Sequence, residues 1–143
     1  MRKILLLISL SLILFAETEF SEPIPSMLEP RKIVFSISSG EDKDINHVLS
    51  TANNVLKFYG PENVNMVIVA YAGGIEGVLK HNTKIAERVR TLMMYEVVFV
   101  ACDNTMRTRH IDHSGLIEGT QIVTAGIVEI IERVQDEWIY IKL

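Results

Sequence analysis

The sequence predicts one α/β domain built on a mainly parallel, five-stranded sheet with helices on both faces. Its 143 residues match the length of a single domain, and 48% of them are hydrophobic, which is enough for a core. Short apolar stretches alternate along the chain with segments whose apolar residues recur at helical spacing. Alternation of this kind predicts a parallel sheet, because each right-handed crossover lays its helix on one face.

The first part of the domain predicts two strands joined by a long helix. Residues 31–38 are rich in Ile, Val and Phe, as expected of a strand. The following segment, with Asp42 or Asp44 as its cap, repeats apolar residues at i, i+3, i+4 and i+7 as far as Tyr59, where a Gly-Pro pair ends the helix. Residues 64–70 are almost continuously apolar, which is typical of a strand covered on both faces.

The second part predicts two more helices and three more strands. In chain order these are a helix capped by Asn82 or Thr83, a buried strand over residues 97–101 that leads into Cys102, a short strand over 120–123, a helix over 127–134 and a last strand over 138–143. Together with the first two, these make five strands.

The N-terminal segment is typical of an exported protein. Arg2 and Lys3 precede an apolar run over residues 4–16, which matches a secretory signal and is short for a membrane span. We therefore expect a signal peptide over 1–16, a periplasmic mature protein and no stable membrane span after cleavage, with an uncleaved anchor as the alternative. Residues 17–30 hold three of the four prolines and predict an extended arm, which leaves 31–143 as the domain.

Charge and glycine patterns argue against two classes of ligand. The net charge is −4, with no long run of either sign, so the cationic surface that nucleic acids require is missing and no nucleic-acid partner is expected. The loop glycines match neither the P-loop nor the dinucleotide-binding fingerprint. We therefore predict no cofactor.

Cys102 is the candidate reactive residue, because ligands of open parallel sheets bind beyond the carboxyl ends of the strands. Asp103, Asn104 and Thr105 follow it and can start a helical turn whose backbone N–H groups favour the thiolate. The other residues predicted at this rim are Ser39, Gly40, Gly73, Gly74, Ala125 and Gly126. A small, inert, buried cysteine is the alternative, and its position in the sequence does not decide between the two.

A loop rich in histidine follows the cysteine and offers two further roles. His110, Asp112 and His113 could surround zinc or copper together with Cys102, although their spacing matches no known metal motif. Either histidine could instead act as a base for the thiol, and a solvated loop is the third reading. We predict no metal site here.

Three stretches carry a resemblance to a known family: "NHVLSTANNVLKFYGPENVNMVIVAYAGGI", "VVFVACDNTM" and "IVTAGIVEIIERVQDEWIYIKL". In these stretches the chain resembles the DsrE/DsrF-like sulfur-relay family, from about Arg31 to the C-terminus. The resemblance implies a flavodoxin-like three-layer sandwich that assembles into homo-oligomers, as dimers, trimers or hexamers. It also implies that a cysteine at this rim receives sulfur as a persulfide, a role that falls on Cys102.

The leading hypothesis is therefore a periplasmic carrier of sulfane sulfur on Cys102, acting as a sulfurtransferase or carrier with a sulfur donor or acceptor protein. The sulfur-relay members of the family work in the cytoplasm, so export would exclude a cytoplasmic acceptor. The alternatives are a non-catalytic oligomeric module that binds a small ligand or metal and keeps Cys102 as a structural residue, and a structural oligomer joined through Tyr59, Tyr95 and Trp138.

Overall fold

The computed structural model describes residues 17–143, so the predicted signal peptide over residues 1–16 lies outside the described part. Five strands form one sheet: β1 Arg31–Ile37, β2 Val64–Ala70, β3 Val98–Cys102, β4 Gln121–Val123 and β5 Ile139–Lys142. Their order is β4-β3-β2-β1-β5, and every neighbouring pair is parallel. The predicted five-stranded α/β fold is therefore confirmed, with a sheet that is parallel throughout.

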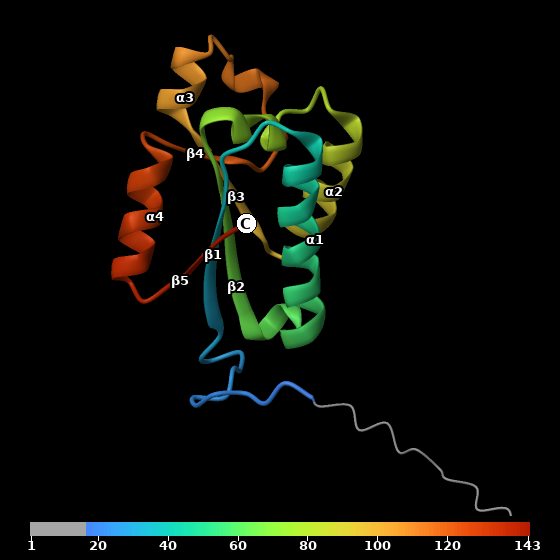
Figure 1. The fold of residues 1–143 in the computed structure, drawn as a ribbon, viewed down its shortest axis with the longest axis vertical. Helices are drawn as coiled ribbons and strands as arrows, with labels where there is room; N and C mark the ends of the chain where they lie inside the picture. The colour runs from blue at the N-terminus through green and yellow to red at the C-terminus, as the bar shows by residue number, and fades with distance from the viewer. Residues whose placement is uncertain (1–16) are drawn as a thin grey trace, which may run out of the picture.

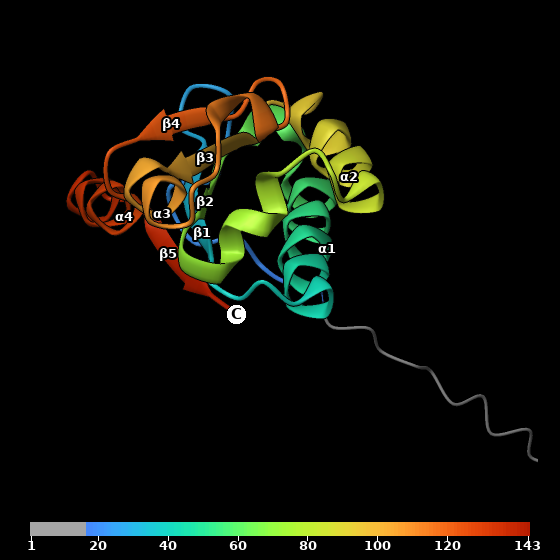
Figure 2. The same cartoon turned by 90° about the horizontal axis from the view of Figure 1, so that it is seen from above.

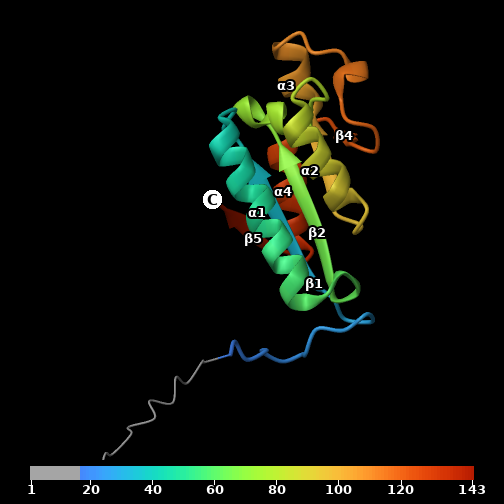
Figure 3. The same cartoon turned by 90° about the vertical axis from the view of Figure 1, so that its right-hand side faces the viewer.

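Helices lie on both faces of this sheet (Figures 1 and 2). Helices α1 Asp42–Tyr59 and α2 Thr83–Met93 cover one face, and α4 Gly126–Gln135 covers the other. Seen from the side in Figure 3, α1 and α2 lie in front of the sheet and α4 lies behind it. The short helix α3, Asp103–Thr108, follows directly on β3 at the carboxyl end of the sheet.

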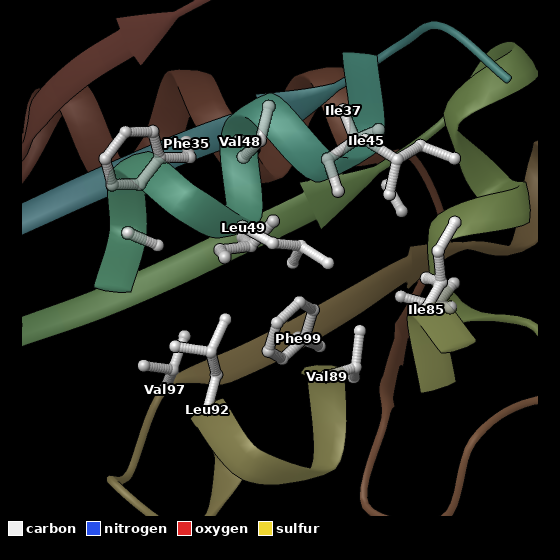
Figure 4. Close-up of a cluster of buried hydrophobic side chains, with 14 of the residues drawn as sticks. Phe35, Ile37, Ile45, Val48, Leu49, Ile85, Val89, Leu92, Val97 and Phe99 are labelled. Atoms are coloured by element: carbon white, nitrogen blue, oxygen red, sulfur yellow. The ribbon is translucent and has the colours of Figure 1, made fainter. Parts of the chain in front are cut away.

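The larger core lies between the sheet and the pair α1 and α2 (Figure 4). Phe35 of β1 and Phe99 of β3 have no exposed surface. They meet the apolar face of each helix, which is formed by residues at helical spacing: Ile45, Val48, Leu49, Ala52 and Leu56 of α1, and Ile85, Ala86, Val89 and Leu92 of α2. This face of the domain follows the periodicity of the sequence closely.

The opposite face has a smaller core, because α4 is the only helix over it among residues 17–143. Its fully enclosed members are Val34, Val67, Val69, Val100 and Ile130. Three other apolar residues of α4, Ile127, Val128 and Ile131, remain 49–50% exposed. The apolar surface of α4 is therefore wider than the part that the sheet covers.

The predicted helix cap is wrong for α1 and confirmed for α2. The N-cap of α1 is Glu41, whose side chain makes no capping hydrogen bond. Asp44 instead accepts a hydrogen bond of 2.6 Å from the Ser39 hydroxyl, so it lies within the first turn. Asn82 does cap α2, because its side chain accepts from the Ile85 N–H.

Gly73 and Gly74, which were predicted at the rim, belong to a 3-10 helix, η2, over Ala72–Val78. Backbone packing explains the glycine at position 74. A Cβ atom there would lie 1.9 Å from the Ile37 carbonyl oxygen, a distance that no side chain can occupy. Glycine thus lets η2 pack directly on the end of β1.

Residues 17–30 contain no helix or strand and run past the amino ends of the strands (Figure 1). The Phe20 ring lies 5.4 Å from the Phe58 ring and 5.8 Å from the Tyr59 ring, measured between centroids. Tyr59 thus packs against another segment of its own chain, and its role in a contact between subunits stays a prediction. None of the helices described over residues 17–143 has the length and apolar content needed to cross a bilayer.

Candidate functional site

Cys102 is the last residue of β3 and the N-cap of α3. It pairs with Val123 in the register of β3 and β4, which places it at the carboxyl end of the sheet as predicted. The residue is 5% exposed. The thiol is therefore more enclosed than a position at the sheet rim alone predicts.

Polar groups adjoin the Cys102 sulfur. Burial raises the pKa of the Cys102 thiol, but hydrogen bonds from the Thr105 hydroxyl and from the backbone N–H groups of Gly126, Thr105 and Asn104 lower it. The hydrogen bonds outweigh burial, so the pKa lies below its ordinary value of 9.0. These donors come from the first turns of α3 and α4, whose N–H groups lack partners within their own helices.

Thr105 is placed to donate to the sulfur. Its Oγ1 atom accepts a hydrogen bond of 3.0 Å from the Ala72 N–H at the start of η2. A hydroxyl has one hydrogen to donate and two lone pairs, so the Thr105 hydrogen stays available for the thiolate. In the protonated state, the thiol has an acceptor in the Thr124 carbonyl oxygen, 4.0 Å from Sγ.

Gly126 brings the start of α4 against the cysteine. A Cβ atom at this position would lie 3.2 Å from Cβ of Cys102, 3.2 Å from Cβ of Tyr71 and 3.1 Å from Cγ1 of Val69. These distances are tighter than ordinary van der Waals contact, so a larger residue would push the helix away. Ala125, the N-cap of α4, offers no side-chain cap, which leaves the first N–H groups of the helix free for other acceptors.

The other predicted rim residues form a separate part of the edge. A Cβ at Gly40 would lie 3.0 Å from the Gly73 carbonyl oxygen, so these two glycines let the β1–α1 loop pack on η2. Ser39 lines a hollow with His47 and Leu143, among others, and this hollow does not include Cys102. The sequence placed all these loops at one edge, and the structure divides that edge into two parts.

His113 contacts a neighbour of the thiol rather than the thiol itself. Its Nε2 atom lies 2.8 Å from Oδ1 of Asp103, and Arg107 Nε lies 3.1 Å from Oδ2 of the same carboxylate. Asp103 is therefore held by two side chains at the start of α3. His113 can influence Cys102 through Asp103, but it is not positioned as the predicted thiol base.

The two remaining candidates of this loop have other roles. His110 is exposed and adopts a left-handed backbone conformation, with φ of 55°, just after α3. Asp112 caps a short 3-10 helix, and its hydrogen bonds with Ser114 hold the pKa of the Asp112 carboxyl below its usual value. In the part of the chain from residue 17 onward, no three His, Cys, Asp or Glu side chains gather as metal ligands. The arrangement of His110, Asp112, His113 and Cys102 around a metal is thus not formed.

Thr108 and Arg109 are residues of this region that sequence reasoning missed. With Ala72, Asn104 and Thr105 they line a surface hollow of about 240 Å³. Thr105, Thr108 and Arg109 are spaced i, i+3 and i+4, so they share one side of α3 and its last turn. That spacing is visible in the sequence, but a helix of six residues gives too short a pattern to identify.

The fold and the site together define a class: a parallel α/β domain that holds a single cysteine among hydrogen-bond donors at the carboxyl end of an inner strand. Residues 31–143 match the DsrE/DsrF-like family, and the chain belongs to that family. The family is associated with sulfur relay.

Solved structures agree with this assignment. The chain is similar to MTH1491 from Methanobacterium thermoautotrophicum, described as a protein of unknown function, with 26% identity and a TM-score of 0.74. It also shares the fold of the ychN protein from E. coli, with 17% identity and a TM-score of 0.70. Each comparison covers 79% of this chain and 99% of the other. A search of curated proteins finds no match.

Proposed function

We propose that the protein carries sulfane sulfur as a persulfide on Cys102. The observation that carries this proposal is the set of donors around the sulfur, which lowers the pKa of the thiol despite its burial. A thiolate is the nucleophilic form of cysteine, and stabilising it raises the fraction able to react near neutral pH. The same groups can donate hydrogen bonds to the anionic terminal sulfur of a persulfide.

The loading step is a displacement at sulfur. The Cys102 thiolate attacks the outer sulfur of a donor such as thiosulfate, and a new S–S bond forms on Sγ. The S–S bond of the donor breaks, and its electron pair leaves with sulfite. The charge is the same before and after the step, and no outside oxidant or reductant is required.

Export is the second part of the proposal, supported by Arg2, Lys3 and the apolar run over residues 4–16. A periplasmic carrier would exchange sulfur with periplasmic donors and acceptors rather than with a cytoplasmic relay. Cell fractionation with the full chain tests this part. Recovery of the protein in the cytoplasm with residues 1–16 intact would contradict it.

Self-association is the third part, and α4 supports it. Ile127, Val128 and Ile131 are about half exposed on α4, the one helix over its face of the sheet within residues 17–143. A second copy of this chain offers the same apolar surface, so a two-fold contact would bury both at once. Tyr95, which is 52% exposed, lies elsewhere, at the end of α2.

The central test is mass spectrometry of the intact protein after incubation with thiosulfate or polysulfide. We expect the addition of one sulfur atom that a reductant removes and that Cys102→Ser does not acquire. Because the chain has a single cysteine, any adduct that persists in the variant lies elsewhere. An unmodified protein, with alkylation of Cys102 only in denaturant, would favour the alternative of a structural cysteine.

A further inference from the structure

We propose that the hollow beside Cys102 binds the anionic part of a small sulfane donor, with Arg109 as its recognition cation. This inference rests on the proposed function and names the class of donor: a free anion such as thiosulfate. Arg109 is a specificity residue in this account, since it recognises the donor and does not attack it.

Two residues connect the hollow to the helix start at Cys102. Asn104 and Thr105 line the hollow, and both belong to the first turn of α3, which Cys102 begins as N-cap. Ala72, which also lines the hollow, is fixed to Thr105 by the hydrogen bond from its N–H to Oγ1. An anion in the hollow therefore lies against the first turn of α3, the helix whose N-cap is Cys102.

The charges around the hollow single out Arg109. Arg107, in the same helix α3, is held by Asp103, with 3.1 Å between Nε and Oδ2. Arg109 lines the hollow and forms no salt bridge with any residue of the described range 17–143. The chain as a whole is acidic, with a net charge of −4, so it repels small anions except where such a cation is local.

The proposed reaction needs this cation. The thiolate and the donor are both negatively charged, so their approach is unfavourable in the absence of a counter-charge. As the S–S bond of the donor breaks, negative charge builds up on the leaving oxyanion. A guanidinium offers several N–H donors in a plane that matches such oxygens, and the Thr108 hydroxyl lines the same hollow.

The test uses two alkylating reagents that differ in charge, iodoacetate and iodoacetamide, on the intact protein with its single cysteine. The ratio of their rate constants measures the preference of the site for an anion independently of sulfur chemistry. We expect Arg109→Gln to lower this ratio by about fivefold, the size of one surface charge pair. Arg109→Lys should keep part of the preference. Arg90→Gln removes the same charge from the exposed surface of α2 and should leave the ratio unchanged.

Thiosulfate loading is then measured in the same proteins, where Arg109→Gln should load more slowly by a similar factor. Equal ratios in wild type and Arg109→Gln would overturn the inference, as would a native thiol that reacts with neither reagent. If the ratio depends on Arg109 but no donor loads sulfur on wild type, the persulfide function fails and the anion site stands. If sulfur loads at the same rate in both proteins, the function stands and the role of Arg109 fails.

Discussion

Thr105→Val tests the origin of the lowered pKa of Cys102. Valine keeps the shape of threonine but cannot donate, so the thiolate loses the hydroxyl while its backbone donors remain. A hydrogen bond to a charged group contributes about 1.5–3 kcal/mol, and one pKa unit corresponds to about 1.4 kcal/mol. The sulfur is nearly buried, so solvent replaces little of this interaction. We therefore expect the pKa of Cys102 to rise, and alkylation at a fixed pH below it to slow by about 10- to 100-fold.

The assay is the pH dependence of iodoacetamide alkylation, followed by mass, which reports one thiol because the chain has one cysteine. Below the pKa, each unit of increase should slow alkylation about tenfold at fixed pH. Thr105→Ser is the matched control, since it restores a hydroxyl and should restore the midpoint. Thr105→Val also removes the acceptor of the Ala72 N–H, and this loss should lower the free energy of unfolding in urea by about 1 kcal/mol. A midpoint that is the same in wild type, Thr105→Val and Thr105→Ser would refute the reasoning.

Three further predictions concern packing, assembly and pH. Gly126→Ala places a Cβ 3.2 Å from Cβ of Cys102, so it should lower the free energy of unfolding by about 1–3 kcal/mol in urea titration. It should also raise the pKa of the thiol, because the first N–H of α4 moves away from the sulfur. Ile131→Glu should dissociate the self-associated form in light scattering without loss of the circular dichroism spectrum, whereas Lys84→Glu on α2 should not. Because the folded pKa of Cys102 lies below the unfolded value of 9.0, the unfolded chain binds more protons between these two values, and stability should rise with pH across that window. Cys102→Ser should remove this rise.

The sequence predicted the strands and the main helices because their signals are local. The spacing of apolar residues in α1 and α2 reports the face that each helix buries, and the continuous apolar run of β2 reports burial on both sides. The apolar run over residues 97–101, followed by a polar segment, also placed Cys102 at the end of a strand. These elements needed no knowledge of distant contacts.

The site was less predictable because its contacts join distant segments. The Gly126 N–H reaches a sulfur 24 positions earlier in the chain, and Thr105 is tied to Ala72, which is 33 positions away. Position alone suggested His113 as a partner of the thiol, yet Asp103 is a better acceptor for an imidazole and lies within reach. The sequence also did not predict that apolar residues of α4 stay exposed, because an amphipathic pattern does not show how much of a helix face the sheet covers.

The burial of Cys102 and its lowered pKa affect different parts of the curve of alkylation rate against pH. Burial alone would disfavour the thiolate, so the donors from α3 and α4 must supply inside the protein what water supplies to a free thiol. Ionisation then sets the midpoint of the alkylation profile, while access to a residue that is 5% exposed sets the plateau at high pH. Thr105→Val should move the midpoint and leave the plateau, whereas denaturant should raise the plateau toward that of a free thiolate. A shielded thiolate would suit the proposed role of holding a persulfide, because the water and thiols that would discharge it meet the same barrier.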